Sequence, residues 1–309
     1  MTDMAEYKEN VADYGLDIHC QMIIEEFRDS QDIFKKLKDV VVESLRKKLR
    51  SIHMVVDLVE ARVKTEESLV GKLEMKGAKY KTLSDVTDIV GARIVSFYTD
   101  EVDKVAAMVE SLFDVDWDNS VDKRKLLKVD SFGYMSLHYV CRIPESLYRD
   151  PEHPELNQIR FEVQMRTALQ HVWASMNHDI GYKSGVEVPG DYLRSLMRLA
   201  GMLELADVEF SRIRKEITDY RRKVEGLVKS GNFADITINA DSFRSYLALD
   251  PFSALNSKIA AINQAEIQQV NGMSYVRVLG KLGFKTLGDV EILKKEYFEP
   301  AYQLAVRQI

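Results

Sequence analysis

The chain has 309 residues, a net charge of −6 and 46% hydrophobic residues, enough for a sizeable core and more than one structural unit. Its two cysteines, Cys20 and Cys141, exclude a disulfide framework and a four-thiolate zinc site. The acidic balance disfavours general coating of nucleic acid, although clustered cations could still form a local phosphate site. The polar first residues and the absence of a long apolar stretch predict a cytoplasmic protein.

Apolar residues recur at steps of three and four over residues 16–50, which predicts N-terminal helices with a break near Ser30, the expected cap of the second helix. The pattern then changes to alternating strands and helices, so residues 52–185 are expected to form an α/β domain with a mixed sheet. The expected strands cover residues 53–63, 89–98, 134–143 and 159–165, and the expected helices cover 65–76, a segment capped at Thr99-Asp100, and 167–178.

A heptad pattern follows the break at Pro189-Gly190, with apolar residues from Leu196 to Leu227 at alternating steps of three and four. It predicts one long helix that ends near Ser230-Gly231-Asn232. Two interpretations stay open: the helix packs on the domain or on the N-terminal helices, or its seam joins copies of the chain into a homo-oligomer.

The C-terminal part is also expected to be helical. Asp250-Pro251 is typical of a helix start, Gly283 of the end of a helix over 273–282, and Ser242 and Thr286 of further caps. From residue 233 onward there are eight Lys or Arg and eight Asp or Glu residues, so a packing or regulatory module is favoured over a duplex-binding one. The predicted division is 1–50, 51–188, 189–231 and 232–309.

Cations gather first around the strand expected to end near Val63. Arg62 and Lys64 stand two residues apart, and Ser68 and Lys72 stand four apart on the following helix, so each pair shares a face. Such a group suits a polyphosphate, although a solvated charged turn would have the same composition.

A second segment, Asp88-Ile89-Val90-Gly91-Ala92-Arg93, places a carboxylate where a loop enters a buried strand. Asp88 suits Mg²⁺, and Arg93 on the same strand suits stacking on a base. A capping Asp and an ion-paired Arg remain an equally good interpretation of these residues alone.

Two further strands carry polar residues at alternate positions. Tyr134, Ser136 and His138 share one face and suit a base stacked on the tyrosine with polar groups beside its sugar, although an ordinary edge strand is the alternative. Glu162, Gln164 and Arg166 share a face of the next strand, where Glu162 is a second candidate metal ligand or base.

Together these motifs resemble the RelA/SpoT synthetase family in order and rough spacing. The resemblance covers about residues 50–185 and rests on Arg62-Val63-Lys64, Asp88–Arg93, Gly133–His138, Glu162–Thr167 and Trp173–Lys183. It implies a nucleotidyltransferase-like α/β domain flanked by helices, in an enzyme that transfers pyrophosphate from ATP to a guanosine nucleotide 3′-hydroxyl.

The resemblance also implies roles for individual residues. Arg62 and Arg93 would hold adenine, and Lys64, Ser68 and Lys72 the ATP phosphates. Asp88 and Glu162 would bind Mg²⁺, with Glu162 alternatively taking the hydroxyl proton. The implied acceptor-binding residues are Tyr134, Ser136, His138, Gln164, Arg166 and Lys128.

Three positions depart from the family pattern: Asp130 and Met135 stand where Lys and Arg are usual beside the acceptor, and Asn177 where Glu is usual. Some short relatives instead pyrophosphorylate the tRNA 3′ end and act as toxins, which would imply tRNA and an antitoxin as partners. A non-catalytic nucleotide-binding protein is the third reading. Only about 50 residues precede the match and they read as helix, so a family-type hydrolase domain is not expected.

Overall fold

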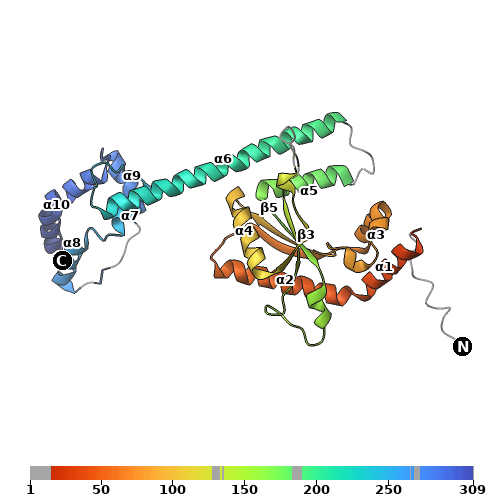
Figure 1. The fold of residues 1–309 in the computed structure, drawn as a ribbon. Coiled ribbons are helices and arrows are strands. Elements are labelled where there is room, and N and C mark those ends of the chain that lie inside the picture. The colour runs from red at the N-terminus through yellow and green to blue at the C-terminus, as the bar shows by residue number, and fades with distance from the viewer. Residues whose placement is uncertain are drawn as a thin grey trace. The chain divides into compact units, whose positions relative to one another are not determined.

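The fold is described by a computed structural model over residues 15–126, 133, 136–182, 190–264, 266–267 and 272–308 (Figure 1). The chain divides into two compact units, Met1–Ser211 and Arg212–Ile309. Within the described ranges, every helix is too short or too polar to span a lipid bilayer. The predicted mixed α/β fold with a helical C-terminal extension is confirmed.

The first unit is built on a mixed sheet with the strand order β1-β2-β5-β4-β3. Its strands are β1 (Leu58–Val63), β2 (Val90–Ser96), β3 (Asp114–Asp122), β4 (Leu137–Arg142) and β5 (Phe161–Thr167). β2 and β5 pair in parallel and the other neighbours pair antiparallel. The motifs on β1, β2, β5 and β4 therefore stand side by side in the sheet, although they are far apart in the sequence.

One face of this sheet is covered by helices. α2 (Gln31–Ser51) packs on β1 and β2, and α4 (Thr99–Leu112) packs on β2 and β5 (Figure 1). The apolar side of α2, with Leu37, Val41 and Leu45 fully buried, meets alternate residues of the strands in one core. Because side chains alternate across a strand, the intervening residues must point to the other face.

The other helices of this unit complete its frame. They are α1 (Ile18–Asp29), α3 (Glu66–Lys76) and α5 (Ala168–Tyr182), and the last lies on the opposite side of the sheet from α2 (Figure 1). The predicted N-terminal helices are confirmed, with the break at Ser30. Ser30 is the N-cap residue of α2, but its side chain makes no capping bond.

The sequence did not predict β3. Its residues Asp114, Asp116, Asp118 and Asp122 belong to a type that is depleted from strands. β3 is an edge strand, where charged residues are tolerated because only one side is paired. Its register with β4 shifts between Asp116 and Val121, which also weakens the alternating pattern.

Other predicted boundaries need correction. The strand expected from residue 53 begins only at Leu58, and α4 has Tyr98 as its N-cap residue instead of a Thr99-Asp100 cap. The Thr99 side chain instead lies 2.8 Å from the Ser211 hydroxyl. Tertiary contacts therefore override the local capping signal at this helix start.

The predicted long helix is α6 (Gly190–Lys229). Within the first unit, the Thr167 hydroxyl donates a 2.5 Å hydrogen bond to the buried Asp207 of α6. Along the heptad pattern, Val224 is buried in the core of the second unit, whereas Phe210 and Ile213 are 55% and 44% exposed. Internal packing and a seam between copies both stay predictions for the rest of the pattern.

The second unit has a small core centred on the fully buried Tyr246. Its further helices are α7 (Ala240–Leu247), α8 (Ser253–Asn263), α9 (Met273–Lys281) and α10 (Leu287–Gln308). Gly283 follows α9 with a φ of +87°, which suits the predicted helix end, and Thr286 accepts a bond from the Asp289 backbone N–H at the start of α10.

Two predicted helix starts in the second unit are shifted. The N-cap residue of α8 is Phe252 instead of Asp250, and that of α7 is Asn239. Ser242 is the third residue of α7 and completes a capping box with Asn239. The signals therefore identified the correct turns but not the residue that caps each helix.

A buried carboxylate provides a test of this fold by pH. The hydrogen bond from Lys36 lowers the pKa of Asp150 from 3.8 to about 2. Burial acts in the opposite direction, and the backbone N–H groups of Glu152 and His153 help to outweigh it. A lowered pKa in the folded state means that the ionised carboxylate stabilises the fold above about pH 4, and that this stabilisation is lost as the pH falls toward 2.

We therefore expect Asp150→Asn to lower the melting temperature at pH 7, with a difference that shrinks as the pH falls from about 4 to 2. Circular dichroism melts across this range measure it. Asp32→Asn is the control, because the Asp32–Lys35 pair is exposed and such pairs contribute little. A difference that stayed constant down to pH 2 would contradict the assignment.

Candidate functional site

The face of the sheet opposite α2 and α4 carries the predicted site residues in adjacent rows. Arg62 of β1 stands opposite Gly91, which stands opposite Glu162. In the next row, Arg93 pairs with Gln164, which pairs with His138 of β4. The register of the sheet therefore brings together residues that are up to 102 positions apart in the sequence, from Arg62 to Gln164.

A cavity of about 310 Å³ opens on this face. It is lined by Glu60, Ala61, Arg62, Lys64, Asp88, Gly91, Ala92, Arg93, Glu162 and Gln164. A larger hollow of about 650 Å³ lies between the start of α1 and the end of α3, but none of the predicted site residues line it. Charge and geometry therefore favour the smaller cavity as the functional site.

Asp88 lies between two ammonium groups. Its carboxylate is 2.6 Å from Lys72 Nζ of α3 and 3.1 Å from Lys64 Nζ, which follows β1. Burial opposes ionisation of Asp88, but the two positive charges outweigh it and hold the pKa of this carboxyl below its ordinary value. Asp88 is thus an anion at neutral pH, and two predicted phosphate-binding residues stand beside it.

The second carboxylate, Glu162, is held from the neighbouring strand. Its Oε1 atom contacts His138 Nδ1 and accepts a 3.3 Å hydrogen bond from Gln164 Nε2. Burial and the charge of Asp88 oppose its ionisation, but the contact with His138 outweighs them and holds the pKa of Glu162 below its ordinary value. Both candidate carboxylates are therefore ionised on one face of the sheet.

The arginines occupy the part of the cavity formed by β1 and β2. Arg62 is exposed, and Arg93 Nη1 donates a 2.9 Å hydrogen bond to Glu60 across the two strands. Glu60 was not predicted as a site residue, although it is the direct cross-strand partner of Arg93. Its position two residues before Arg62 was the only sequence signal.

The remaining predicted residues do not all reach the cavity. Ser68 is half-buried on α3 but does not line it. Arg166 is almost fully buried and donates a 2.7 Å hydrogen bond to Gln164 Oε1. Tyr134 and Lys128 lie outside the described residues, as do Asp130 and Met135.

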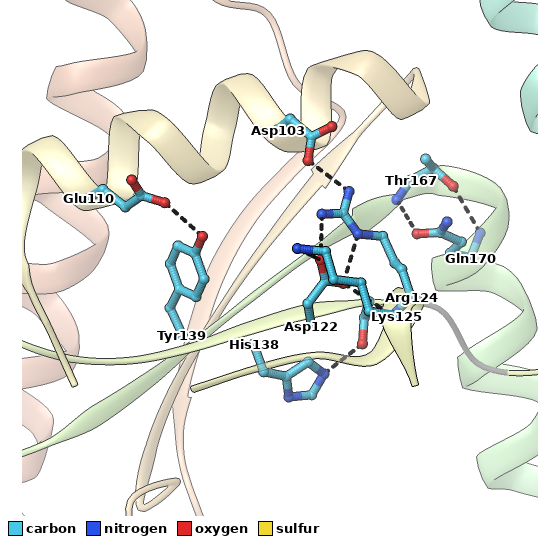
Figure 2. Close-up of polar contacts among 10 residues, drawn as sticks. Asp103, Glu110, Asp122, Arg124, Lys125, His138, Tyr139, Thr167 and Gln170 are labelled. Carbon is cyan, nitrogen blue, oxygen red and sulfur yellow. Dashed lines mark hydrogen bonds and ion pairs between the residues drawn. The ribbon is translucent and has the colours of Figure 1, made fainter. Parts of the chain in front are cut away.

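Two neighbouring cations after β3 have different surroundings. Arg124 donates hydrogen bonds to both Asp103 and Asp122, and Figure 2 shows it held between them. Burial and the nearby Arg166 lower the pKa of Lys123, against the opposing effect of Glu162. Lys123 is thus close to the candidate site, whereas Arg124 is engaged by structural carboxylates, a difference that their adjacent positions did not reveal.

The carboxylate pair fits a magnesium ion. Asp88 and Glu162 line the same cavity, and the charge of Asp88 acts against ionisation of Glu162, so a divalent cation would relieve their repulsion. Among the described residues, no three His, Cys, Asp or Glu side chains gather as a complete metal site. Mg²⁺ needs only one or two carboxylates when phosphate oxygens supply other ligands.

Comparison with known proteins agrees with this geometry. Residues 61–187 match the family described as a region found in RelA / SpoT proteins. Residues 61–187 belong to the RelA/SpoT family. Two relatives from Bacillus subtilis (strain 168), GTP pyrophosphokinases YwaC and YjbM, are each 27% identical to this chain. The matches cover 53% of this chain and 77% of YwaC, and 60% of this chain and 90% of YjbM.

Solved structures share the fold of the part of this chain that contains the matched region. Small alarmone synthetase 1 from Bacillus subtilis, bound to its product pppGpp, has a TM-score of 0.54 and 21% identity, and covers 63% of this chain and 99% of its own. The protein smu.1046c from Streptococcus mutans UA159 has a TM-score of 0.50 and 25% identity, and covers 62% of this chain and 97% of its own. The sheet and its flanking helices are therefore the fold of small alarmone synthetases.

The two neighbouring cations give a matched test of the site. Arg124→Gln should lower the melting temperature, because it leaves Asp103 and Asp122 without their shared partner. Lys123→Gln should weaken binding of an anionic probe, inorganic pyrophosphate, in calorimetric titration, because it removes a cation near Glu162 and Arg166. If Lys123→Gln binds pyrophosphate as tightly as the native chain, Lys123 does not belong to the site.

Proposed function

We propose that this chain is a GTP/GDP pyrophosphokinase that transfers the β,γ-pyrophosphate of ATP to the 3′-hydroxyl of a guanosine nucleotide, making (p)ppGpp-type alarmones. The observation that carries this proposal is the cavity of the RelA/SpoT region, where Asp88 and Glu162 stand with Lys64, Arg62 and Arg93 on one sheet face. Both curated relatives are named GTP pyrophosphokinases.

The ATP donor is proposed to lie along β1 and β2. Arg62 and Arg93 project from neighbouring strands, and planar guanidinium groups can stack on both faces of a base. Lys64, which lines the cavity, and Lys72, which lies beside Asp88, would bind the phosphates, with Ser68 on the same helix as Lys72. Because these two ammonium groups already contact Asp88, phosphate oxygens would share them with this carboxylate.

Mg²⁺ is the proposed cofactor, held by Asp88 and Glu162, and when bound it would neutralise charge on the transferred pyrophosphate. The protein itself supplies alignment and fixed charge, which phosphoryl-type transfer needs more than covalent chemistry. The acceptor O3′ forms a bond to the β-phosphorus of ATP while the bond from this phosphorus to the α–β bridging oxygen breaks. AMP leaves, and the hydroxyl proton passes to the Glu162 carboxylate.

The acceptor is proposed to lie against β4 and β5. Tyr134 would stack on its guanine, and Gln164 and Arg166 would stand beside its sugar and phosphates, with Lys128 as a further cation. Lys123 adds a positive charge on this side, because its pKa responds to both Glu162 and Arg166. This charge offsets part of the positive charge that is lost where Asp130 and Met135 stand in place of the Lys and Arg usual in the family.

The proposal is tested with purified protein, Mg²⁺ and γ-³²P-labelled ATP, offered GDP, GTP or tRNA in separate reactions. We expect label to appear in a guanosine 3′-pyrophosphate and AMP to be released in equal amount. If only tRNA became labelled, the acceptor would be an RNA 3′ end and not a guanosine nucleotide. Tight ATP binding without AMP release would mean that the chain binds nucleotide but does not catalyse transfer.

The two carboxylates provide the matched mutational test. Asp88→Asn and Glu162→Gln should each lower the transfer rate at least about 100-fold, because each removes charge at the reacting phosphates. Glu110→Gln is the control, since Glu110 accepts a bond from Tyr139 on the helix-covered face of the sheet. Rates are compared at equal folded fraction, judged by circular dichroism, and near-native turnover in either site variant would refute its role.

A further inference from the structure

His138 uses both ring nitrogens within the protein. Its Nε2 atom lies 2.6 Å from the Ser136 hydroxyl, and its Nδ1 atom contacts Glu162 Oε1. Ser136 is fully buried and the His138 side chain is 10% exposed. The imidazole therefore has no ring nitrogen left to bind a substrate directly, although its position suggested an acceptor-binding residue.

The hydrogen bonds to Glu162 from the described residues all reach one carboxylate oxygen. Both His138 Nδ1 and Gln164 Nε2 meet Oε1, and Gln164 is itself held by Arg166 through a 2.7 Å bond. The Oε2 atom of Glu162, whose side chain lines the cavity, is the oxygen that these contacts leave for a ligand. The network thus distinguishes two otherwise equivalent oxygens.

Hydrogen-bond chemistry gives this chain of contacts a direction. An ionised carboxylate can only accept, so His138 donates through Nδ1–H, and in the neutral imidazole Nε2 then accepts from the Ser136 hydroxyl. The carboxylate thereby selects the Nδ1–H tautomer, and the hydroxyl, which can donate to Nε2, holds the ring in place. The Ser136 backbone also accepts a 3.0 Å bond from the Lys123 N–H, which ties this network to the neighbouring cation.

We propose that Ser136 and His138 are positioning residues which hold Glu162 by Oε1 and present Oε2 to the reacting 3′-hydroxyl. The inference rests on the proposed pyrophosphokinase function and deepens it, because it moves both residues from acceptor binding to alignment of the carboxylate. A carboxylate fixed before the reaction needs no reorientation as O3′ attacks, which lowers the barrier without tightening substrate binding.

Two amide substitutions separate the two ring nitrogens. The amide nitrogen of Asn reaches the place of Nδ1, and that of Gln reaches the place of Nε2. His138→Asn therefore keeps a donor to Glu162, whereas His138→Gln keeps a partner for Ser136 and loses that donor. We expect His138→Gln to lower kcat about 10- to 100-fold, with little change in KM for ATP or acceptor, and His138→Asn to retain most of the native rate.

A binding readout accompanies the kinetics. The Kd of Mn²⁺ in the presence of a non-hydrolysable ATP analogue, followed by electron paramagnetic resonance, should weaken in His138→Gln more than in His138→Asn. Ser136→Ala should cause a smaller loss of kcat than His138→Gln, since the ring still reaches Glu162. Melting temperatures of all variants exclude general unfolding as the cause.

The outcomes separate the inference from the function on which it rests. Equal rates in both His138 variants, or a raised KM for the acceptor with unchanged kcat, would overturn the positioning role and leave the pyrophosphokinase proposal intact. If the native chain transfers no pyrophosphate while Mn²⁺ affinity still separates the two variants, the proposed function fails and the alignment of Glu162 stands. If neither readout separates the variants, the positioning role is wrong.

Discussion

The contact between Asp88 and its two lysines joins three segments on which the site depends. Lys64 follows β1, Lys72 lies on α3, and Asp88 precedes β2, so one carboxylate ties the start of one strand to the end of its neighbour and to the helix between them. The three side chains are 10–25% exposed, which leaves their attraction less screened than that of a surface pair. Removal of Asp88 would leave two neighbouring ammonium groups without their shared counterion.

In this arrangement Asp88 and a bound polyphosphate would compete for the same two ammonium groups. The lysines stabilise the Asp88 carboxylate, yet a polyphosphate in the cavity would attract the same ammonium groups. Glu162 is stabilised differently, by the imidazole of His138 and the amide of Gln164 instead of by ammonium groups. An anion in the cavity would therefore compete with Asp88 for its lysines, whereas the partners of Glu162 are not ammonium groups.

Sequence reasoning found the strands whose polar and apolar residues alternate, since that pattern follows from a sheet with one covered face. β4 and β5 were found on this basis and β2 from its β-branched and aromatic residues, with Arg93, Glu162 and Gln164 on the open face. It missed β3, because aspartates alternate there on an edge strand, and it placed the starts of α4 and α8 incorrectly because tertiary contacts or turn geometry decide them. Local signals cannot include a partner such as Ser211 that lies 112 positions away.

The same limit applies to the site. Spacing predicted that Ser136 and His138 share a face, but it could not reveal that both ring nitrogens of His138 are already engaged. Nor could it separate Lys123 from Arg124, because the carboxylates that hold Arg124 come from both α4 and β3. Membership of a face follows from local periodicity, whereas the role of each polar group depends on which neighbours satisfy its hydrogen bonds.

β4 shows how closely stability and chemistry are placed in this fold. His138 and the adjacent Tyr139 point to opposite sides of the strand (Figure 2), the first toward Glu162 and the second toward Glu110 of α4. Burial and the bond to Glu110 raise the pKa of Tyr139, which keeps it a neutral hydrogen-bond donor on the core side. Because the period of a strand is two residues, a shift of one position would exchange these surroundings and place a phenol beside Glu162 and an imidazole in the core. The register that buries the core is thus the same constraint that aligns the candidate site, so the site cannot be displaced along β4 without disrupting the packing of α4.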